Sequence, residues 1–402
     1  MRWRILALLA IAELLGMSLW FVGSASAPQL QEIYGITSSQ TAWLTTMVQL
    51  GFVAGTAAAA IFNLADIFSS RNYFAVAAVA GAVCNASLLV APAFGAIILT
   101  RFLVGFSLAG VYPPAMKMIS TWFDNERGLA IGTIVGALTV GKAGPYLVHA
   151  IGSVSVHVIV LTSSFGAIAA ALLVLVAYRD GPHAFPRRTF SWSLATLVVR
   201  QRAWRLSTMG YLGHMWELYA FWTWITAFFL ASMSFRSAHG LHVPSTGVSE
   251  LLAFGAIAVG GIGAVLGGWI ADRVGQEKLV MAAMALSGSC ALLIGLLFGA
   301  SPWLLAPLAF VWGITVIADS AQFSTLVTRA VPQHAVGTAL TLQTSLGFLL
   351  TMASIQLIPF LVQVMGWQWS FAALSIGPAL GIAAIARLAA RSRLRTDSTL
   401  AA

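Results

Sequence analysis

The sequence predicts an all-α membrane protein whose twelve transmembrane helices form two pseudo-symmetric six-helix bundles. Composition, the number of long apolar runs and the position of the charges predict this class. Of the 402 residues, 59% are hydrophobic and only 8% are charged, and the mean hydropathy is +0.89. Soluble domains carry about 25% charged residues, so this chain lacks the polar side chains to cover a water-facing surface. The composition therefore excludes a soluble enzyme, a nucleic-acid-binding protein and a disordered chain.

Twelve apolar runs can be recognised, and each is long enough to cross a bilayer, which takes about 20 helical residues. A helix satisfies its own backbone hydrogen bonds in lipid, so each run is predicted to be helical. The runs cover residues 5–27, 42–64, 73–91, 95–118, 128–150, 155–177, 206–232, 248–270, 279–299, 303–326, 335–363 and 368–390.

The basic residues give the orientation of these spans. If the N-terminus is cytoplasmic, 18 of the 21 Lys and Arg residues lie on or at the edge of the cytoplasmic side. Only Arg236 falls outside, and Arg101 and Lys142 lie within spans. Cytoplasmic loops carry an excess of Lys and Arg, so we expect a multi-pass protein of the cell inner membrane with both termini cytoplasmic. The net charge of +9 thus reflects topology, and no nucleic-acid partner is expected.

The first apolar run has a second interpretation. Arg2 and Arg4, the run itself and Ala25-Ser26-Ala27 are together similar to a signal peptide with its cleavage site. The run carries Glu13, however, and its pattern recurs in the seventh span. These two features favour a retained first helix.

The longest charged loop divides the chain into two similar halves. We expect an N-terminal bundle over residues 1–177, a cytoplasmic linker over 178–205 and a C-terminal bundle over 206–402. Four pairs repeat in chain order, namely Glu13 and Trp20 with Glu217 and Trp224, Leu64-Ala65-Asp66 with Ile270-Ala271-Asp272, Cys84 with Cys290, and Gly128 with Gly337. Such duplication in transporters places the substrate site at the interface of the halves.

Local motifs carry a family resemblance that extends over essentially the whole chain. The segment 268–275, Gly-Trp-Ile-Ala-Asp-Arg-Val-Gly, resembles the conserved cytoplasmic loop motif of the major facilitator superfamily. Its first-half copy at 62–71 keeps Asp66 and a distal cation but lacks both glycines. Arg101 with Gly105 resembles the family's Arg-x-x-x-Gly pattern in span 4.

Two further stretches resemble particular branches of this family. Gly144-Pro145 in span 5 partly matches the antiporter motif. The segment 210–219 is similar to bacterial members grouped with the cyanate and nitrate permeases. The arginines that nitrate carriers use in spans 2 and 8 are absent from this sequence, which argues against nitrate itself.

The resemblance implies a secondary active transporter that works by alternating access, with spans 1, 4, 7 and 10 around a central cavity. It also implies a cytoplasmic gate, in which Asp66 and Asp272 latch the halves together beside Arg127 and Arg273. A solvated loop is the alternative for each acid. We expect a monomer that carries a small solute and protons, with no cofactor and no metal site. No nucleophile–base pair or metal cluster occurs at membrane depth in the sequence, so an enzyme is not expected.

Ionisable residues within spans are functional candidates, because a charge near the bilayer centre costs about 2.5–3.5 kcal/mol. Glu13 and Trp20 lie seven residues apart on one helix face, and Glu217 and Trp224 repeat this spacing. His214 lies one turn before Glu217 on the same face. One hypothesis makes Glu217 a proton carrier tuned by His214, with Glu13 as its counterpart. The alternative is a fixed Glu217–His214 hydrogen bond and an ion pair from Glu13 to Lys142 or Arg101.

Arg101 and Lys142 are the two deep cations of the sequence. A buried guanidinium binds a carboxylate through two parallel hydrogen bonds, so Arg101 is either an anion ligand or a structural arginine bonded to the backbone. Lys142 is either a substrate or coupling residue or part of a core ion pair. Asp319 in span 10 is either a further protonation site or a gate partner of Lys117.

The sequence therefore predicts a proton-coupled symporter for a small anionic solute. We expect Arg101, Lys142, Trp20, Trp224 and His214 to bind the solute, and Glu217, Glu13 and Asp319 to couple protons. The alternative function is proton-driven efflux of lipophilic drugs or metabolites.

Overall fold

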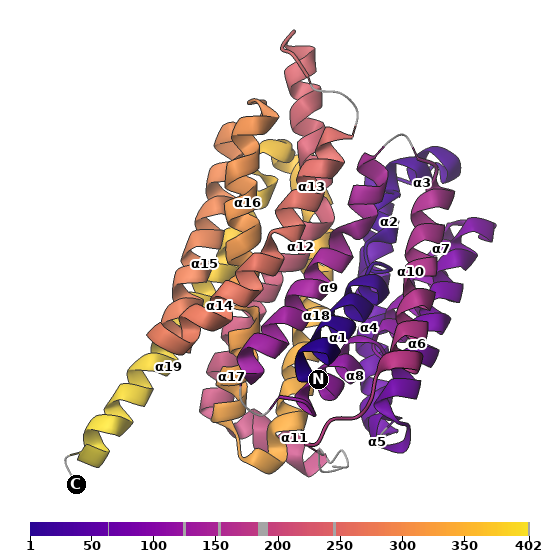
Figure 1. Ribbon diagram of the computed structural model, residues 1–402. Coiled ribbons are helices and arrows are strands. Elements are labelled where there is room, and N and C mark those ends of the chain that lie inside the picture. Colours follow the sequence, from indigo (N-terminus) through magenta and orange to yellow (C-terminus); the bar gives the residue numbers. More distant parts are fainter. Residues whose placement is uncertain (63, 124–125, 152–153, 184–191, 244–246, 401–402) are drawn as a thin grey trace.

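The computed structural model describes the chain except residues 63, 124–125, 152–153, 184–191, 244–246 and 401–402 (Figure 1). Side chains are also left out at 65, 66, 127, 192 and 392–400. Within the described residues the regular structure is entirely helical.

The first six spans run through nine helices of the described chain. In order they are α1 (Arg2–Met17) with α2 (Val22–Ala25), α4 (Ser38–Ile61), α6 (Ser70–Ala86) with η1 (Ser87–Val90), α7 (Phe94–Leu108) with α8 (Tyr112–Ser120), α9 (Arg127–Ala150), and α10 (Val156–Ala177). The short helices α3 (Ala27–Tyr34) and α5 (Leu64–Ile67) follow the first and second spans.

The last six spans follow the helix α11 (Trp192–Arg200). They are α12 (Arg202–Ala238), α13 (Val248–Ala258) with α14 (Gly260–Val274), α15 (Gln276–Leu293) with η2 (Ile294–Leu297), α16 (Pro302–Ala318) with α17 (Ser320–Ala330), α18 (Val336–Ser370), and α19 (Ile376–Leu400). The short helices η3 (Gln333–Ala335) and η4 (Phe371–Ser375) lie before and after α18.

The predicted twelve spans are confirmed, and the described chain has ten helical stretches that are long and apolar enough to cross a membrane. The first span escapes that count because α1 stops at Met17 and the helix resumes only at Val22. The last of the ten, Gln333–Arg391, contains two spans. They part at Gly366, whose φ of 74° lies in the left-handed region that glycine adopts without strain.

Three of the spans that the resemblance places around the centre are broken near mid-membrane. Span 1 is interrupted between Met17 and Val22, and span 4 between Leu108 and Tyr112. In span 10 the break falls at Asp319. Each break removes intrahelical hydrogen bonds, and groups freed within lipid need partners from the protein itself.

The two ends of the molecule differ. The N-terminus, α5, α11 and the C-terminal end of α19 lie at one end, hereafter the basic face, whereas α3 lies at the opposite face (Figure 1). Helix α11, which the sequence analysis leaves inside the linker, packs there on the second half. Its Val198 is fully buried in one apolar cluster with Trp204, Val327 and Ala339.

Glycines allow neighbouring helices to touch backbone to backbone in both halves. Where α4 crosses α7, a methyl group on Gly105 would overlap the carbonyl oxygen of Val48. Where α14 crosses α16, a methyl group on Gly267 would overlap the carbonyl oxygen of Ala318. Spans 2 and 4 therefore pack like spans 8 and 10, as the duplication predicts. Small residues at helix crossings are the usual means of close packing in membranes.

Gly267→Ala is expected to lower the melting temperature of the purified protein, because forcing a methyl group into a filled crossing costs about 1–3 kcal/mol. Gly268→Ala is the matched control, since the nearest neighbouring atom there lies 4.0 Å from the added carbon. Thermal unfolding in detergent measures both. Equal melting temperatures for the two variants would contradict the close crossing of α14 and α16.

Candidate functional site

Arg101 holds the break in span 1 together. Its guanidinium is fully buried and donates from Nη2 to the backbone oxygens of Leu19 (2.8 Å) and Trp20 (2.9 Å). Its Nη1 donates to Asn85 Oδ1 at 2.9 Å, and Asn85 in turn donates to Ser164 Oγ and to the Val160 backbone oxygen. In this conformation the guanidinium binds protein oxygens, as expected for a structural arginine bonded to the backbone and not for an anion ligand.

Lys142 lies at the centre of the molecule, where the two halves meet. Its ammonium group is 4.0 Å from the ring centroid of Trp20, which belongs to the interrupted stretch of span 1. The rings of Tyr219 and Trp222 on α12 lie 4.8 and 5.5 Å away. Lys142 Nζ donates a hydrogen bond to Tyr219 Oη. An ammonium over aromatic faces gains cation–π energy, which offsets part of its desolvation.

Hydrogen-bond donors outnumber acceptors around this ammonium group. The indole N–H groups of Trp20 and Trp222 are buried and have no acceptor in the described structure. No carboxylate of the described residues lies within ion-pair distance of Lys142. A site with one cation and two unused N–H donors has the chemistry to bind an anion.

Glu13 is the acid that faces Lys142 from the neighbouring helix. Helices α1 and α9 touch where Gly141 packs against the Leu14 backbone, so Glu13 and Lys142 are at one level. Glu13 is fully buried, and neither carboxyl oxygen has a hydrogen-bond partner in the described structure. A buried carboxyl group with no hydrogen-bond partner destabilises the fold, so its presence indicates a functional role.

Glu217 is placed differently from Glu13, despite the repeated spacing in sequence. Its carboxylate accepts hydrogen bonds from Ser287 Oγ at 2.8 Å and from Trp312 Nε1 at 2.7 Å. Both donors belong to the second half, on α15 and α16. Glu217 is therefore engaged inside its own bundle, and the hydrogen bond to His214 that was the alternative to a proton-carrier role is absent from the described contacts.

His214 instead faces Asp319 at the break of span 10. Its Nδ1 lies 2.8 Å from Asp319 Oδ1, and both side chains are buried. The distance is that of an ion pair, yet the atoms are not aligned for a hydrogen bond, and His214 Nε2 also lacks a partner. The structure thus pairs two residues that the sequence analysis assigns to different roles.

The two repeated tryptophans also occupy unequal positions. Trp20 packs against Phe52, Tyr219 and Phe348, so it lies between the halves. Trp224 donates from Nε1 to the Ile355 backbone oxygen and packs near Trp367, so it lies within the second half. Of the expected indole pair, only Trp20 is at the central site.

Contacts between the halves close the opposite face. His149 Nδ1 on α9 lies 3.8 Å from Glu250 Oε1 on α13. Tyr146 donates to the Trp222 backbone oxygen at 3.3 Å. Gln356 on α18 donates to Thr46 Oγ1 on α4 at 3.0 Å.

At the basic face, Asp272 of the second half lies close to the first half. A methyl group on Gly128 would lie 3.9 Å from Asp272 Oδ2, so this carboxylate is close to the first turn of α9. Arg273 stacks on its own helix neighbour Trp269, 3.5 Å from the ring centroid. The side chains of Asp66 and Arg127 lie outside the described residues.

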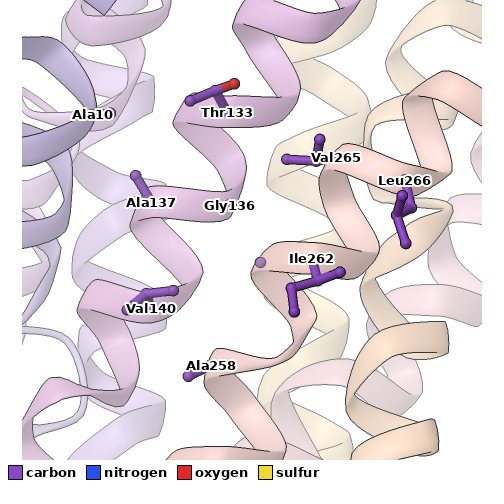
Figure 2. A pocket seen from close by; sticks show the side chains of 10 residues that line it. Ala10, Thr133, Gly136, Ala137, Val140, Ala258, Ile262, Val265 and Leu266 are labelled. Atoms are coloured by element: carbon purple, nitrogen blue, oxygen red, sulfur yellow. The ribbon is translucent and has the colours of Figure 1, made fainter. Parts of the chain in front are cut away.

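A shallow apolar groove runs between α9 and the pair α13 and α14, away from these polar groups (Figure 2). Small residues and the larger aliphatic side chains of Ile262 and Leu266 line it, and a methyl group on Gly136 would lie 3.0 Å from the Gly261 backbone oxygen. Its lining contains no charged residue. The groove marks the crossing of spans 5 and 8 and is separate from the central site.

Sequence reasoning missed Tyr219 and Trp222 as members of the central site. The one available signal was the crowding of Trp216, Trp222 and Trp224 in a short segment of span 7. It does not say which ring faces the other half, because span 7 is buried on most sides.

Comparisons with known proteins give the chain a family. The sequence profile of the Major Facilitator Superfamily matches residues 8–354 and 237–400. The MFS-type transporter hasB of Aspergillus fumigatus is 24% identical over 276 residues, which cover 63% of this chain and 57% of that protein. The hexuronate transporter of Escherichia coli K12 is 27% identical over 154 residues, or 38% of this chain and 35% of that one. The chain thus spans about half or less of each relative's length.

A solved structure shares the whole fold. The inward-facing, occupied form of a bacterial homologue of the human lysosomal transporter Spinster covers 96% of this chain, with 97% of its own length matched. The TM-score is 0.68 at 15% sequence identity. Fold, spans and family profile agree, and this chain belongs to the Major Facilitator Superfamily of membrane transporters.

Proposed function

We propose that this transporter is a proton-coupled carrier of small organic anions, working by alternating access in the cell inner membrane as a monomer with both termini cytoplasmic. The observation that carries the proposal is the ammonium group of Lys142. It lies buried between the two halves with no carboxylate partner among the described residues. Burying an unpaired ammonium group within the membrane costs free energy, and a negatively charged solute that pairs with it would offset that cost.

The surroundings of Lys142 favour a carboxylate on a ring-shaped solute. The unused indole N–H groups of Trp20 and Trp222 supply two further donors, and aromatic rings pack well against apolar ring faces. A uronic acid has both features, and one relative is a hexuronate transporter. Arg101 acts indirectly in this proposal, because it holds the Leu19 and Trp20 backbone.

For the coupled proton we propose Glu13. It lies beside Lys142 and has no hydrogen-bond partner in the described structure, so its protonation responds directly to whether an anion occupies the neighbouring ammonium. The pair His214–Asp319, at the break of span 10, is a second place where a proton can reside. Glu217 receives a structural role here, because Ser287 and Trp312 already satisfy its oxygens.

Alternating access requires that each face close in turn. The cross-half contacts of His149 with Glu250 and of Gln356 with Thr46 support closure of the opposite face. For the basic face we propose a latch of Asp272 on the first turn of α9, where the helix dipole attracts a carboxylate. Asp66, Arg127 and Arg273 complete that gate in the proposal.

Lys142→Met is expected to weaken binding of D-galacturonate about 10- to 100-fold, because a hydrogen bond to a charged group contributes about 1.5–3 kcal/mol. Neutral D-galactose serves as the uncharged comparison. The measurement is the thermal shift of purified protein across a ligand titration, where saturating ligand stabilises the fold by a few kcal/mol.

Lys278→Met, which removes an exposed lysine of α15, is the matched control and should bind like the wild type. Equal stabilisation of the wild type by galacturonate and galactose would contradict an anion site. Stabilisation by lipophilic cations alone would favour the second candidate, drug or metabolite efflux, to which the aromatic rings around Lys142 are also suited.

Glu13→Gln is expected to abolish accumulation of galacturonate driven by a proton gradient in proteoliposomes, while exchange against preloaded galacturonate continues. The amide keeps the size of the side chain and cannot carry the proton. Glu217→Gln is the comparison, and it should lower thermal stability more than coupling. If Glu217→Gln loses accumulation and Glu13→Gln keeps it, the assignment of the proton site is reversed.

A further inference from the structure

The hydrogen bond from Lys142 to Tyr219 joins the two halves of the transporter. Lys142 belongs to α9 of the first half and Tyr219 to α12 of the second, and each is only 3% exposed. The tyrosine ring is fixed by its neighbours, with centroids of Phe348 and Trp222 at 5.3 and 5.4 Å. Its hydroxyl oxygen is thus a preformed acceptor for the ammonium group.

The hydroxyl of Tyr219 contacts the same ammonium group that is proposed to bind the anionic solute. Tyr219 Oη is a neutral oxygen, whereas a carboxylate oxygen carries negative charge and so attracts the ammonium group electrostatically as well as by a hydrogen bond. An ammonium group has three N–H donors, and this one is surrounded by the rings of Trp20, Tyr219 and Trp222. A carboxylate that reaches Lys142 therefore competes with the tyrosine hydroxyl for the ammonium group. The tyrosine is the weaker acceptor and can be displaced.

The position of this bond along α9 gives the displacement a mechanical consequence. Lys142 lies closer to Ala150, the end of α9 at the opposite face, than to Arg127 at the basic face. The other cross-half contacts at that end, made by Tyr146, His149 and Gln356, do not involve Lys142. An anion that binds Lys142 therefore acts directly on one hydrogen bond between the halves near the opposite face, the bond from Lys142 to Tyr219.

We propose that Tyr219 is a positioning residue whose hydroxyl takes the place of the solute carboxylate on Lys142 in the empty carrier and ties the halves together. An arriving anion takes over the ammonium and releases the tie, so that binding at the centre loosens the opposite face. This inference rests on the proposed anion site at Lys142.

Tyr219→Phe tests competition first, because it removes the hydroxyl and keeps the ring. Affinity for D-galacturonate is expected to rise about tenfold, since the solute no longer displaces a hydrogen bond to a charged donor. Tyr211→Phe is the matched control, a half-buried tyrosine on the same helix that packs near His214 and Phe323. Its affinity should equal that of the wild type.

The tie itself is tested without any solute. Spin labels at Val90 and Trp303, two exposed residues near the opposite face in different halves, report the separation there by electron paramagnetic resonance. The background carries Cys84→Ser and Cys290→Ser, because both cysteines are free thiols. In the empty carrier, Tyr219→Phe should lengthen the distance between the two labels. Galacturonate should lengthen it in the same way in the protein that keeps Tyr219.

A double-mutant cycle separates this role from simple packing. Lys142→Met should produce the same shift as Tyr219→Phe, and the double variant should add nothing further. Unchanged distances in Tyr219→Phe would overturn the tie, whether or not affinity rises. A distance shift in a protein that binds no galacturonate would support the tie and count against the proposed solute instead.

Discussion

The interaction on which the central site depends is the bond from Arg101 to the backbone of span 1. The helix stops at Met17, and the freed carbonyl groups of Leu19 and Trp20 lie where no water is available to bind them. Arg101 satisfies both, and Asn85 orients the guanidinium from span 3. The cost of burying a guanidinium is offset by three hydrogen bonds, and the break places the Trp20 ring over Lys142 instead of along a continuous helix.

The fold could be predicted almost completely from the sequence, because lipid leaves few alternatives. Each apolar run had to become a helix, and most of the charges had to stay outside the bilayer. The breaks were not predicted, since a run such as 5–27 has the same composition whether the helix is continuous or interrupted. Tyr112-Pro113-Pro114 at the break of span 4 is the one local signal of this kind.

The site could be predicted only in part, because the duplication that shapes the helix crossings does not extend to the contacts of the site's side chains. Glu13 and Glu217 repeat in spacing, yet Ser287 and Trp312 bind Glu217 while Glu13 has no partner in the described structure. Trp20 and Trp224 diverge in the same way. These differences arise from side chains on distant spans, and the sequence alone does not indicate which distant side chains come into contact. The central site that results is asymmetric, with the cation from the first half and its acceptor from the second.

The most direct test of the account is a measurement of proton movement with the solute. Purified transporter is reconstituted in liposomes that contain a pH-sensitive dye, and a gradient of D-galacturonate is applied at equal internal and external pH. The account predicts that the lumen acidifies as galacturonate enters and that D-galactose produces no change. Uptake of galacturonate with a constant internal pH would contradict proton coupling, and equal responses to both sugars would contradict the anion site at Lys142.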